Sequence, residues 1–190
     1  MTLNIVHADD VPPQAWRNGG GTTRELLCWP STLDWALRVS VADITRDGPF
    51  SSFPGIERWF AVIEGAGVAL TFGDDERRVA TDDAPLQFDG AAAPGCRLLD
   101  GSTRDLNLML RGGQGVMRIA ENGVAWEAPF TLRALFTSGP GRWFGGTDER
   151  RLAAHTLLWS DAASPAAWSF EPDAPSMRAW WLGFSPEGLR

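Results

Sequence analysis

Short runs of alternating apolar and polar residues, separated by Gly, Pro, Asp or Ser, recur along the whole of this 190-residue chain. Residues 35–42 and 105–111 alternate most cleanly, so each run places its apolar side chains on one face and its polar side chains on the other. No convincing long helical pattern interrupts the series. Evenly spaced short strands without a long helix are typical of sandwiches and barrels, and the sequence therefore predicts an all-β fold.

The segment Gly-Gly-Gln-Gly at residues 112–115 is the best candidate for a domain boundary. Beyond it, short predicted strands continue in the same style without repeating the motifs of the first half. Because 190 residues suit two small domains better than one oversized sheet, we expect two consecutive jelly-roll barrels. The first covers residues 1–111, and the second, which is degenerate, covers residues 112–190.

The segment from Trp16 to Glu25 reads Trp-Arg-Asn-Gly-Gly-Gly-Thr-Thr-Arg-Glu and concentrates residue types that an ordinary connection does not need. Three consecutive glycines suit unusual backbone angles or a close approach to another group, and their N–H groups are candidates for an anion-binding nest. The flanking side chains supply stacking, charge and hydrogen bonds. The alternative is a flexible turn that leads into a strand at residues 22–27.

The charge balance limits the classes of partner. The net charge is −7, and all 17 cationic side chains are arginine because lysine is absent. An acidic chain without a basic tract is not expected to bind nucleic acid or an anionic membrane surface. Neither a signal peptide nor a membrane span is readable, so we expect a cytoplasmic protein. Cys28 and Cys96 lie in predicted strands and are expected to be buried free thiols.

Few side chains are available for catalysis. Lys and Tyr are absent, which excludes Schiff-base chemistry and tyrosine acid catalysis. His7 and His155 lie outside the motifs, so we expect no metal centre, no nucleophilic triad and no cofactor. Glu25 and Asp105 remain as the candidate carboxylates for acid–base work.

Polar residues lie opposite the apolar faces of the two alternating strands. Arg38 and Ser40 belong to one strand, and Asp105 and Asn107 belong to the other. These four side chains either line the interior of a barrel or face solvent, and the alternation alone does not choose between the two.

Four motifs, in the same order, give this sequence a resemblance to the HutD/Ves family. They are Trp16 to Glu25, Asp-Gly-Pro-Phe-Ser-x-Phe-Pro-Gly at residues 47–55, Glu-Gly-x-Gly at residues 64–67 and Asp-Leu-Asn-x-Met at residues 105–109. The second half resembles the family mainly in its length and strand-rich style. Arg17 stands where lysine is common in the family, which keeps the charge and changes the donor geometry.

The resemblance implies a bicupin without a metal centre, with a pocket in the first barrel and a regulatory role in histidine utilisation. It also implies that the ligand is formylglutamate or a related intermediate, and no enzymatic activity is established for the family. Carried over by motif, the pocket residues are Trp16, Arg17, Asn18, Thr22, Thr23, Glu25, Phe50, Phe53, Asp105, Asn107 and Met109. The alternation argument adds Arg38 and Ser40.

Three functions stay open. The leading hypothesis is a non-enzymatic, metal-independent bicupin that binds a small polar or anionic metabolite and regulates histidine utilisation. The alternative is a metal-independent cupin isomerase or epimerase that uses Glu25 or Asp105 as its base. The third is a structural, partner-binding barrel with an exposed apolar patch. The sequence also leaves a homodimer open.

Overall fold

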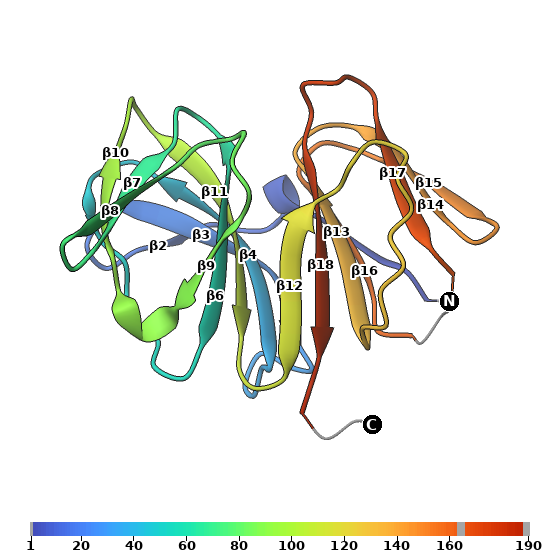
Figure 1. Ribbon diagram of the computed structural model, residues 1–190, viewed down its shortest axis with the longest axis horizontal. Coiled ribbons are helices and arrows are strands. Elements are labelled where there is room, and N and C mark those ends of the chain that lie inside the picture. The colour runs from blue at the N-terminus through green and yellow to red at the C-terminus, as the bar shows by residue number, and fades with distance from the viewer. Residues whose placement is uncertain (1, 163–165, 188–190) are drawn as a thin grey trace. The chain divides into compact units, whose positions relative to one another are not determined.

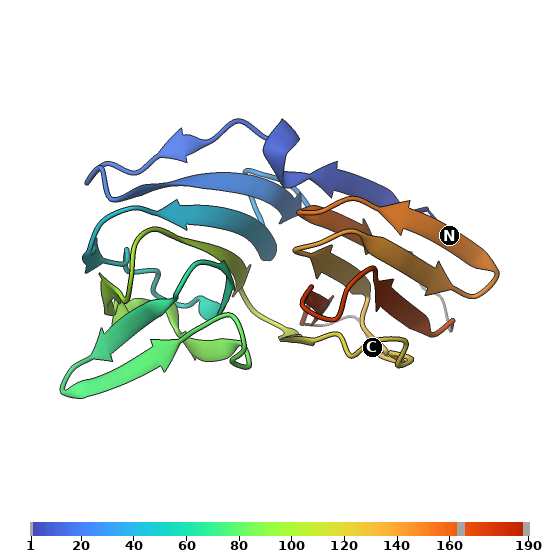
Figure 2. The same cartoon turned by 90° about the horizontal axis from the view of Figure 1, so that it is seen from above.

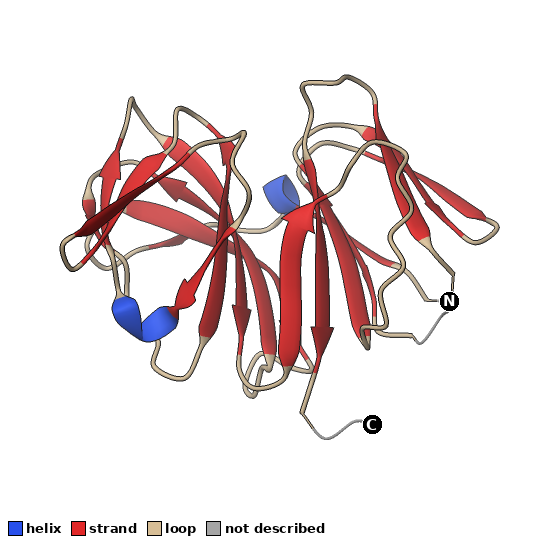
Figure 3. Ribbon diagram, viewed as in Figure 1, coloured by secondary structure: helices blue, strands red, loops and turns tan. Residues whose placement is uncertain are grey.

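The computed structural model describes residues 2–162 and 166–187, and these residues form an all-β fold with two short 3-10 helices. The chain divides into two compact units (Figure 1). One unit is the continuous segment Val11–Gly112, and the other joins the residues up to Asp10 with those from Gly113 onward. Each unit contains two antiparallel sheets (Figure 3).

A six-stranded sheet forms the larger layer of the unit Val11–Gly112. Its strand order is β2 (Gln14–Ala15), β3 (Gly21–Trp29), β4 (Leu37–Ile44), β11 (Thr103–Leu110), β6 (Glu57–Glu64) and β9 (Leu86–Asp89). The four-stranded second layer has the order β5 (Gly48–Pro49), β10 (Gly95–Leu98), β7 (Val68–Phe72) and β8 (Asp75–Val79). The 3-10 helix η2 (Gly90–Ala92) follows β9. Figure 2 shows this unit from above.

Side chains from both sheets make up the apolar core of this unit. Phe60 and Val62 come from β6, and they pack in one cluster with Val68 and Leu70 of β7. Because side chains alternate along a strand, residues 58, 60 and 62 of β6 share one face. Arg58 therefore lies on the same face as the core residues Phe60 and Val62.

A five-stranded and a three-stranded sheet form the other unit. The first has the order β1 (Asn4–His7), β16 (Thr156–Ser160), β13 (Leu132–Thr137), β18 (Ala179–Ser185) and β12 (Gln114–Ile119). The second has the order β15 (Asp148–Leu152), β14 (Gly141–Gly145) and β17 (Trp168–Pro172), and the 3-10 helix η1 (Ala8–Asp10) follows β1. Tryptophans dominate the core: Trp126 stacks on Trp181 at 5.0 Å between ring centroids, and Trp143 meets Trp168 edge-on at 5.1 Å.

The unit boundaries differ from the expected 1–111 and 112–190 at the N-terminus. Strand β1 pairs with β16 through the register Asn4↔Trp159 to His7↔Thr156, so the first ten residues belong with the C-terminal part of the chain. Local sequence patterns identify a strand but carry no information about a partner some 150 residues away. Cys96 is a buried free thiol as expected, whereas the free thiol of Cys28 is only partly buried.

Candidate ligand-binding site

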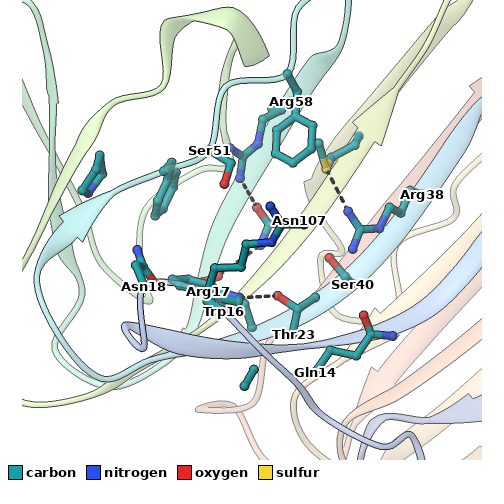
Figure 4. A pocket seen from close by; sticks show the side chains of 17 residues that line it. Gln14, Trp16, Arg17, Asn18, Thr23, Arg38, Ser40, Ser51, Arg58 and Asn107 are labelled. Carbon is teal, nitrogen blue, oxygen red and sulfur yellow. Dashed lines mark hydrogen bonds between the residues drawn. The ribbon is translucent and has the colours of Figure 1, made fainter.

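A cavity of about 620 Å³ opens in the unit Val11–Gly112 (Figure 4). It is lined by β3, β4, β6 and β11 and by residues before β3 and around β5. Most of the predicted site residues line it: Trp16, Arg17, Asn18, Thr23, Arg38, Ser40, Phe50, Phe53, Asp105, Asn107 and Met109. The other lining residues are Gln14, Ala15, Ala42, Pro49, Ser51 and Arg58.

Strand register places the polar lining residues in rows across three neighbouring strands. Met109 of β11 lies between Arg38 of β4 and Arg58 of β6. One step along, Asn107 lies opposite Ser40, and Asp105 lies opposite Ala42 in the row after that. The even-numbered leucines of β11 point to the opposite face and are buried. The alternation in 105–111 therefore marks the cavity face, and the solvent-facing alternative is wrong because Ser40, Asp105 and Asn107 are buried.

A chain of hydrogen bonds joins three buried polar residues on the cavity wall. Arg58 donates from Nη2 to Asn107 Oδ1 at 2.9 Å, and Asn107 donates from Nδ2 to Asp105 Oδ2 at 3.1 Å. Asn107 therefore uses both ends of its amide to connect a cation and a carboxyl group. Within the described part of the chain, Arg58 Nε, Arg58 Nη1 and Asp105 Oδ1 have no hydrogen-bond partner.

Aromatic rings enclose the Arg58 guanidinium. Its Cζ lies 5.0 Å from the ring centroid of Phe50, 5.1 Å from that of Phe88 and 5.7 Å from that of Phe53. Ring faces attract a cation, so the three rings hold the guanidinium in place. Burial lowers the pKa of Arg58 to about 10, against the opposing effect of the Asp105 charge.

Asp105 is the one carboxyl group among the residues that line the cavity, and only 1% of its surface is exposed. Burial raises the pKa of Asp105 to about 8, although the hydrogen bond from Asn107 and the charge of Arg58 act in the opposite direction. Removing a charge from water is costly, and no direct ion pair offsets that cost here. Asp105 therefore holds a proton over much of the neutral pH range.

Glu25 lies outside the cavity lining and supports a residue inside it. Arg38 donates from Nε to Glu25 Oε2 at 2.8 Å, and Arg38 Nη1 lies 3.8 Å from the sulfur of Met109. The strand pairing shifts register between Glu25 and Leu27. Burial and the hydrogen bond to Glu25 raise the pKa of Cys28 to about 12, so that thiol stays neutral.

The three glycines lie outside the cavity lining, and two of their amides are not free for the anion-binding nest that the sequence suggested. The amide of Gly19 donates to Trp16 O at 3.0 Å, and that of Gly20 donates to Asn18 Oδ1 at 3.0 Å, so both are already used. A Cβ on Gly21 would collide with the backbone oxygen of Asp43, so this position requires glycine. Trp16 is fixed by a 2.7 Å hydrogen bond from Nε1 to Thr23 Oγ1.

Arg17 is the exposed cation of the site. It lines the cavity, and it has no ion pair or hydrogen bond to any other residue that the structure describes. Figure 4 shows Arg17 together with Asn18 and Trp16 on the segment before β3. This guanidinium is therefore available to a ligand.

Thr22 does not line the cavity. Adjacent residues of a strand point to opposite faces, so Thr23 faces the cavity, whereas Thr22 lies 3.5 Å from Asp43 Oδ2. On that other face, Asp43 also accepts from Arg24 Nη1 at 2.5 Å and from Arg104 Nε at 2.7 Å.

Both histidines belong to the other unit. His7 Nδ1 lies 2.9 Å from Thr156 Oγ1, and His155 Nδ1 lies 3.7 Å from Asp9 Oδ2. In residues 2–162 and 166–187, no group of three or more His, Cys, Asp or Glu side chains is placed to hold a metal ion. The same residues contain no helix with the length and hydrophobicity that a membrane span requires.

Comparison with known protein families gives one family match and several related proteins. The family model HutD matches residues 8–171. The chain belongs to the HutD family. One relative is the uncharacterized 21.2 kDa protein of the hutC 3' region of Pseudomonas putida, which is 33% identical over 165 residues and matches 85% of this chain and 75% of its own length. Protein Ves of Escherichia fergusonii is 36% identical over 170 residues, 80% of this chain and 89% of its own.

Solved structures agree with the family assignment. HutD from Pseudomonas fluorescens SBW25 superimposes with a TM-score of 0.85 at 26% identity, over 98% of this chain and all of its own. A cupin 2 conserved barrel protein from Leptotrichia buccalis, at 8% identity and a TM-score of 0.56, covers 96% of both chains. That likeness concerns the fold alone, which is cupin-like.

Proposed function

We propose that this HutD-family protein is a bicupin whose first barrel, built by Val11–Gly112, binds a small anionic metabolite. We further propose that this binding regulates histidine utilisation, with formylglutamate or a related intermediate as the ligand. The observation that carries the proposal is the charge of the cavity lining. Three arginines, Arg17, Arg38 and Arg58, line it with a single carboxyl group, that of Asp105.

The dimensions and surroundings of the cavity support a small ligand. Its volume of about 620 Å³ falls within the range of small-molecule pockets. Aromatic and sulfur-containing side chains accompany the arginines, so the ligand meets apolar walls as well as cations. Arg17 is placed to meet a carboxylate with two parallel hydrogen bonds, which a planar guanidinium favours.

Calorimetric titration tests this function. Histidine, urocanate, formiminoglutamate and formylglutamate are each titrated into the wild type, and we expect formylglutamate to bind with the highest affinity because, of the four, it alone carries two carboxylates and no cationic group. No millimolar or better binding by any of the four would refute the proposed ligand class.

The variant Arg17→Ala locates the binding. A charge-assisted hydrogen bond contributes about 1.5 to 3 kcal/mol, so the dissociation constant is expected to rise by about one to two orders of magnitude. The unfolding free energy is expected to change by only about 0.5 kcal/mol because the side chain is exposed. The control Arg77→Ala removes the same charge from the exposed strand β8 and is expected to leave the affinity unchanged. Equal affinity of the Arg17→Ala variant and the wild type would remove Arg17 from the site.

A second candidate function is favoured by Asp105. A carboxyl group at the cavity wall whose pKa is raised to about 8 by burial has the protonation behaviour of a general acid or base at neutral pH. Glu25 is paired with Arg38 outside the lining, so Asp105 is the candidate base of a metal-independent isomerase or epimerase. Exchange of carbon-bound hydrogen for deuterium in a bound ligand, lost in Asp105→Asn, would establish this chemistry. Absence of exchange in the wild type with every ligand that binds would refute it.

The third hypothesis, a partner-binding barrel, has little support. The large apolar side chains that are exposed in the described chain are Leu33 in one unit and Ile5 and Val124 in the other. Single exposed apolar residues of this kind are normal on protein surfaces.

A further inference from the structure

The three cavity arginines differ in how their charge is already balanced. Arg38 is paired with Glu25 at 2.8 Å, whereas Arg17 has no partner in the described chain. Arg58 has no ion pair, and its charge is opposed by Asp105, to which it is connected through Asn107. The site therefore offers one unbalanced cation, Arg17, and a second one only when Asp105 is neutral.

We propose that the cavity binds a dianion together with one proton, which Asp105 holds while a negative charge of the ligand lies near Arg58. This inference rests on the proposed function and specifies its ligand class and its pH dependence. In this inference Asp105 acts through Asn107 and Arg58 and not as a base on the ligand, so its carboxyl group makes no direct contact with the ligand. Binding forms one O–H bond on Asp105 from a solvent proton, and no bond of the ligand breaks.

The geometry around Asp105 favours this arrangement. Asp105 Oδ2 accepts a hydrogen bond from Asn107, whereas Oδ1 is buried and has no hydrogen-bond partner in the described residues. Oδ1 is therefore the oxygen that can carry the proton. If Asp105 were ionised, it and a bound anion would be two negative charges close together in the same cavity. Like charges in a site of low dielectric repel strongly, and protonation of the weaker acid relieves the repulsion.

The other charged groups near Asp105 do not replace it as the proton acceptor. Arg58 on β6 lowers the pKa of Asp105, and Asp43 on β4 raises it from the opposite face. Asp43 is held ionised by Arg24 and Arg104, and burial keeps the pKa of the Cys96 thiol on β10 at about 12. Arg38 on β4 is paired with Glu25.

The sign of the pH dependence follows from these contacts. Burial raises the pKa of Asp105 to about 8, so well below pH 8 the proton is already present in the free protein and binding takes up almost none. Above pH 8 Asp105 has lost its proton in the free protein, so binding of a dianion requires Asp105 to take up a proton from solvent. The dissociation constant for a dianion is then expected to rise about tenfold between about pH 7 and about pH 9. A monoanion placed at Arg17 requires no such proton.

The test uses calorimetry with the full-length protein at about pH 6.5 and about pH 9, in buffers of different ionisation enthalpy. Formylglutamate and glutarate are the dianionic probes, and glutaramate is the monoanionic one. We expect proton uptake near zero at the lower pH and approaching one per dianion at the higher pH, with little uptake for glutaramate. Dianion binding at about pH 9 without proton uptake would overturn the inference.

The variant Asp105→Asn supplies the second measurement. It is nearly isosteric with the protonated side chain, so it is expected to bind the dianions at about pH 9 more tightly than the wild type, with less than about a twofold change between the two pH values. Asp74→Asn makes the same charge change outside the cavity lining and is expected to behave as the wild type. Weaker binding by a folded Asp105→Asn variant at both pH values would mean that Asp105 contacts the ligand directly, and would refute the inference.

The two proposals fail in different ways. If no probe binds the wild type at either pH, the proposed binding function is wrong, and the inference falls with it. If the dianions bind and the number of protons taken up is zero at about pH 9, the binding function stands and the role of Asp105 is wrong.

Discussion

Replacing Asp105 by Asn is expected to remove a large pH dependence from the stability of the fold. Burial raises the pKa of Asp105 from 3.8 to about 8. Between these pH values the folded protein keeps a proton that the unfolded chain has released, so the unfolding free energy of the wild type falls as pH rises. A tenfold difference in proton affinity corresponds to about 1.4 kcal/mol, which sets an upper limit of about 6 kcal/mol for the whole range. Relaxation around a buried charge reduces this, and we expect a change of about 2 to 3 kcal/mol.

Urea denaturation of the wild type and Asp105→Asn at several values from about pH 5 to about pH 9 measures this effect. The asparagine carries no titrating proton, so the unfolding free energy of the variant minus that of the wild type is expected to increase steadily with pH. Other titrating groups are common to both proteins and cancel in the difference. The absolute stability of the variant is less informative, because the new amide places an unpaired donor in a buried position.

The control Asp74→Asn removes a carboxylate from an exposed turn and is expected to give a difference that does not vary with pH. A flat difference for Asp105→Asn over the same range would refute the reasoning, because it would mean that Asp105 ionises in the folded protein as easily as in the unfolded chain.

Three further substitutions test other parts of the site. Gly21→Ala is expected to lower the unfolding free energy by about 1 to 3 kcal/mol in urea denaturation, because the new Cβ collides with backbone oxygen; unchanged stability would contradict this. Asp43→Asn is expected to destabilise the protein above about pH 4 and to match the wild type at lower pH. Burial alone would raise the pKa of Asp43, but the hydrogen bonds and charges of its two arginine partners lower it, so a deficit that persists in acid would argue against this account. Glu25→Gln frees the charge of Arg38 and is expected to tighten binding of formylglutamate about two- to fivefold in calorimetry, whereas weaker binding would place Glu25 in direct contact with the ligand.

The sequence predicted which side chains share a face on strands β4 and β11, because each of these strands has one polar and one apolar face. The alternation predicted that residues 38 and 40 share one face and that residues 105, 107 and 109 share another, and the structure adds that both faces line the cavity. Arg58 was missed because it begins the run Arg-Trp-Phe-Ala-Val-Ile, which is apolar on both faces. Strand β6 is largely buried on both sides, so its sequence does not indicate which face carries the cavity.

The positions of Thr22 and Glu25 outside the cavity lining have a related cause. A motif carried over as a block includes neighbouring residues, whereas a strand directs neighbours to opposite faces, so Thr22 and Thr23 cannot both face the cavity. Glu25 precedes a shift in the register of β3 and β4, which a sequence pattern does not reveal. The structure groups residues 1–10 with the C-terminal part of the chain through the pairing of β1 with β16, which is not local and so is not visible in the sequence.

The location of the ligand is the central claim, and a crystal structure of the protein with formylglutamate at saturating concentration tests it most directly. The account predicts density for the ligand in the cavity, with one carboxylate within hydrogen-bond distance of the Arg17 guanidinium and the other on the side of Arg58. Ligand density elsewhere on the protein, or a cavity that holds only water when calorimetry shows the protein to be saturated, would contradict it.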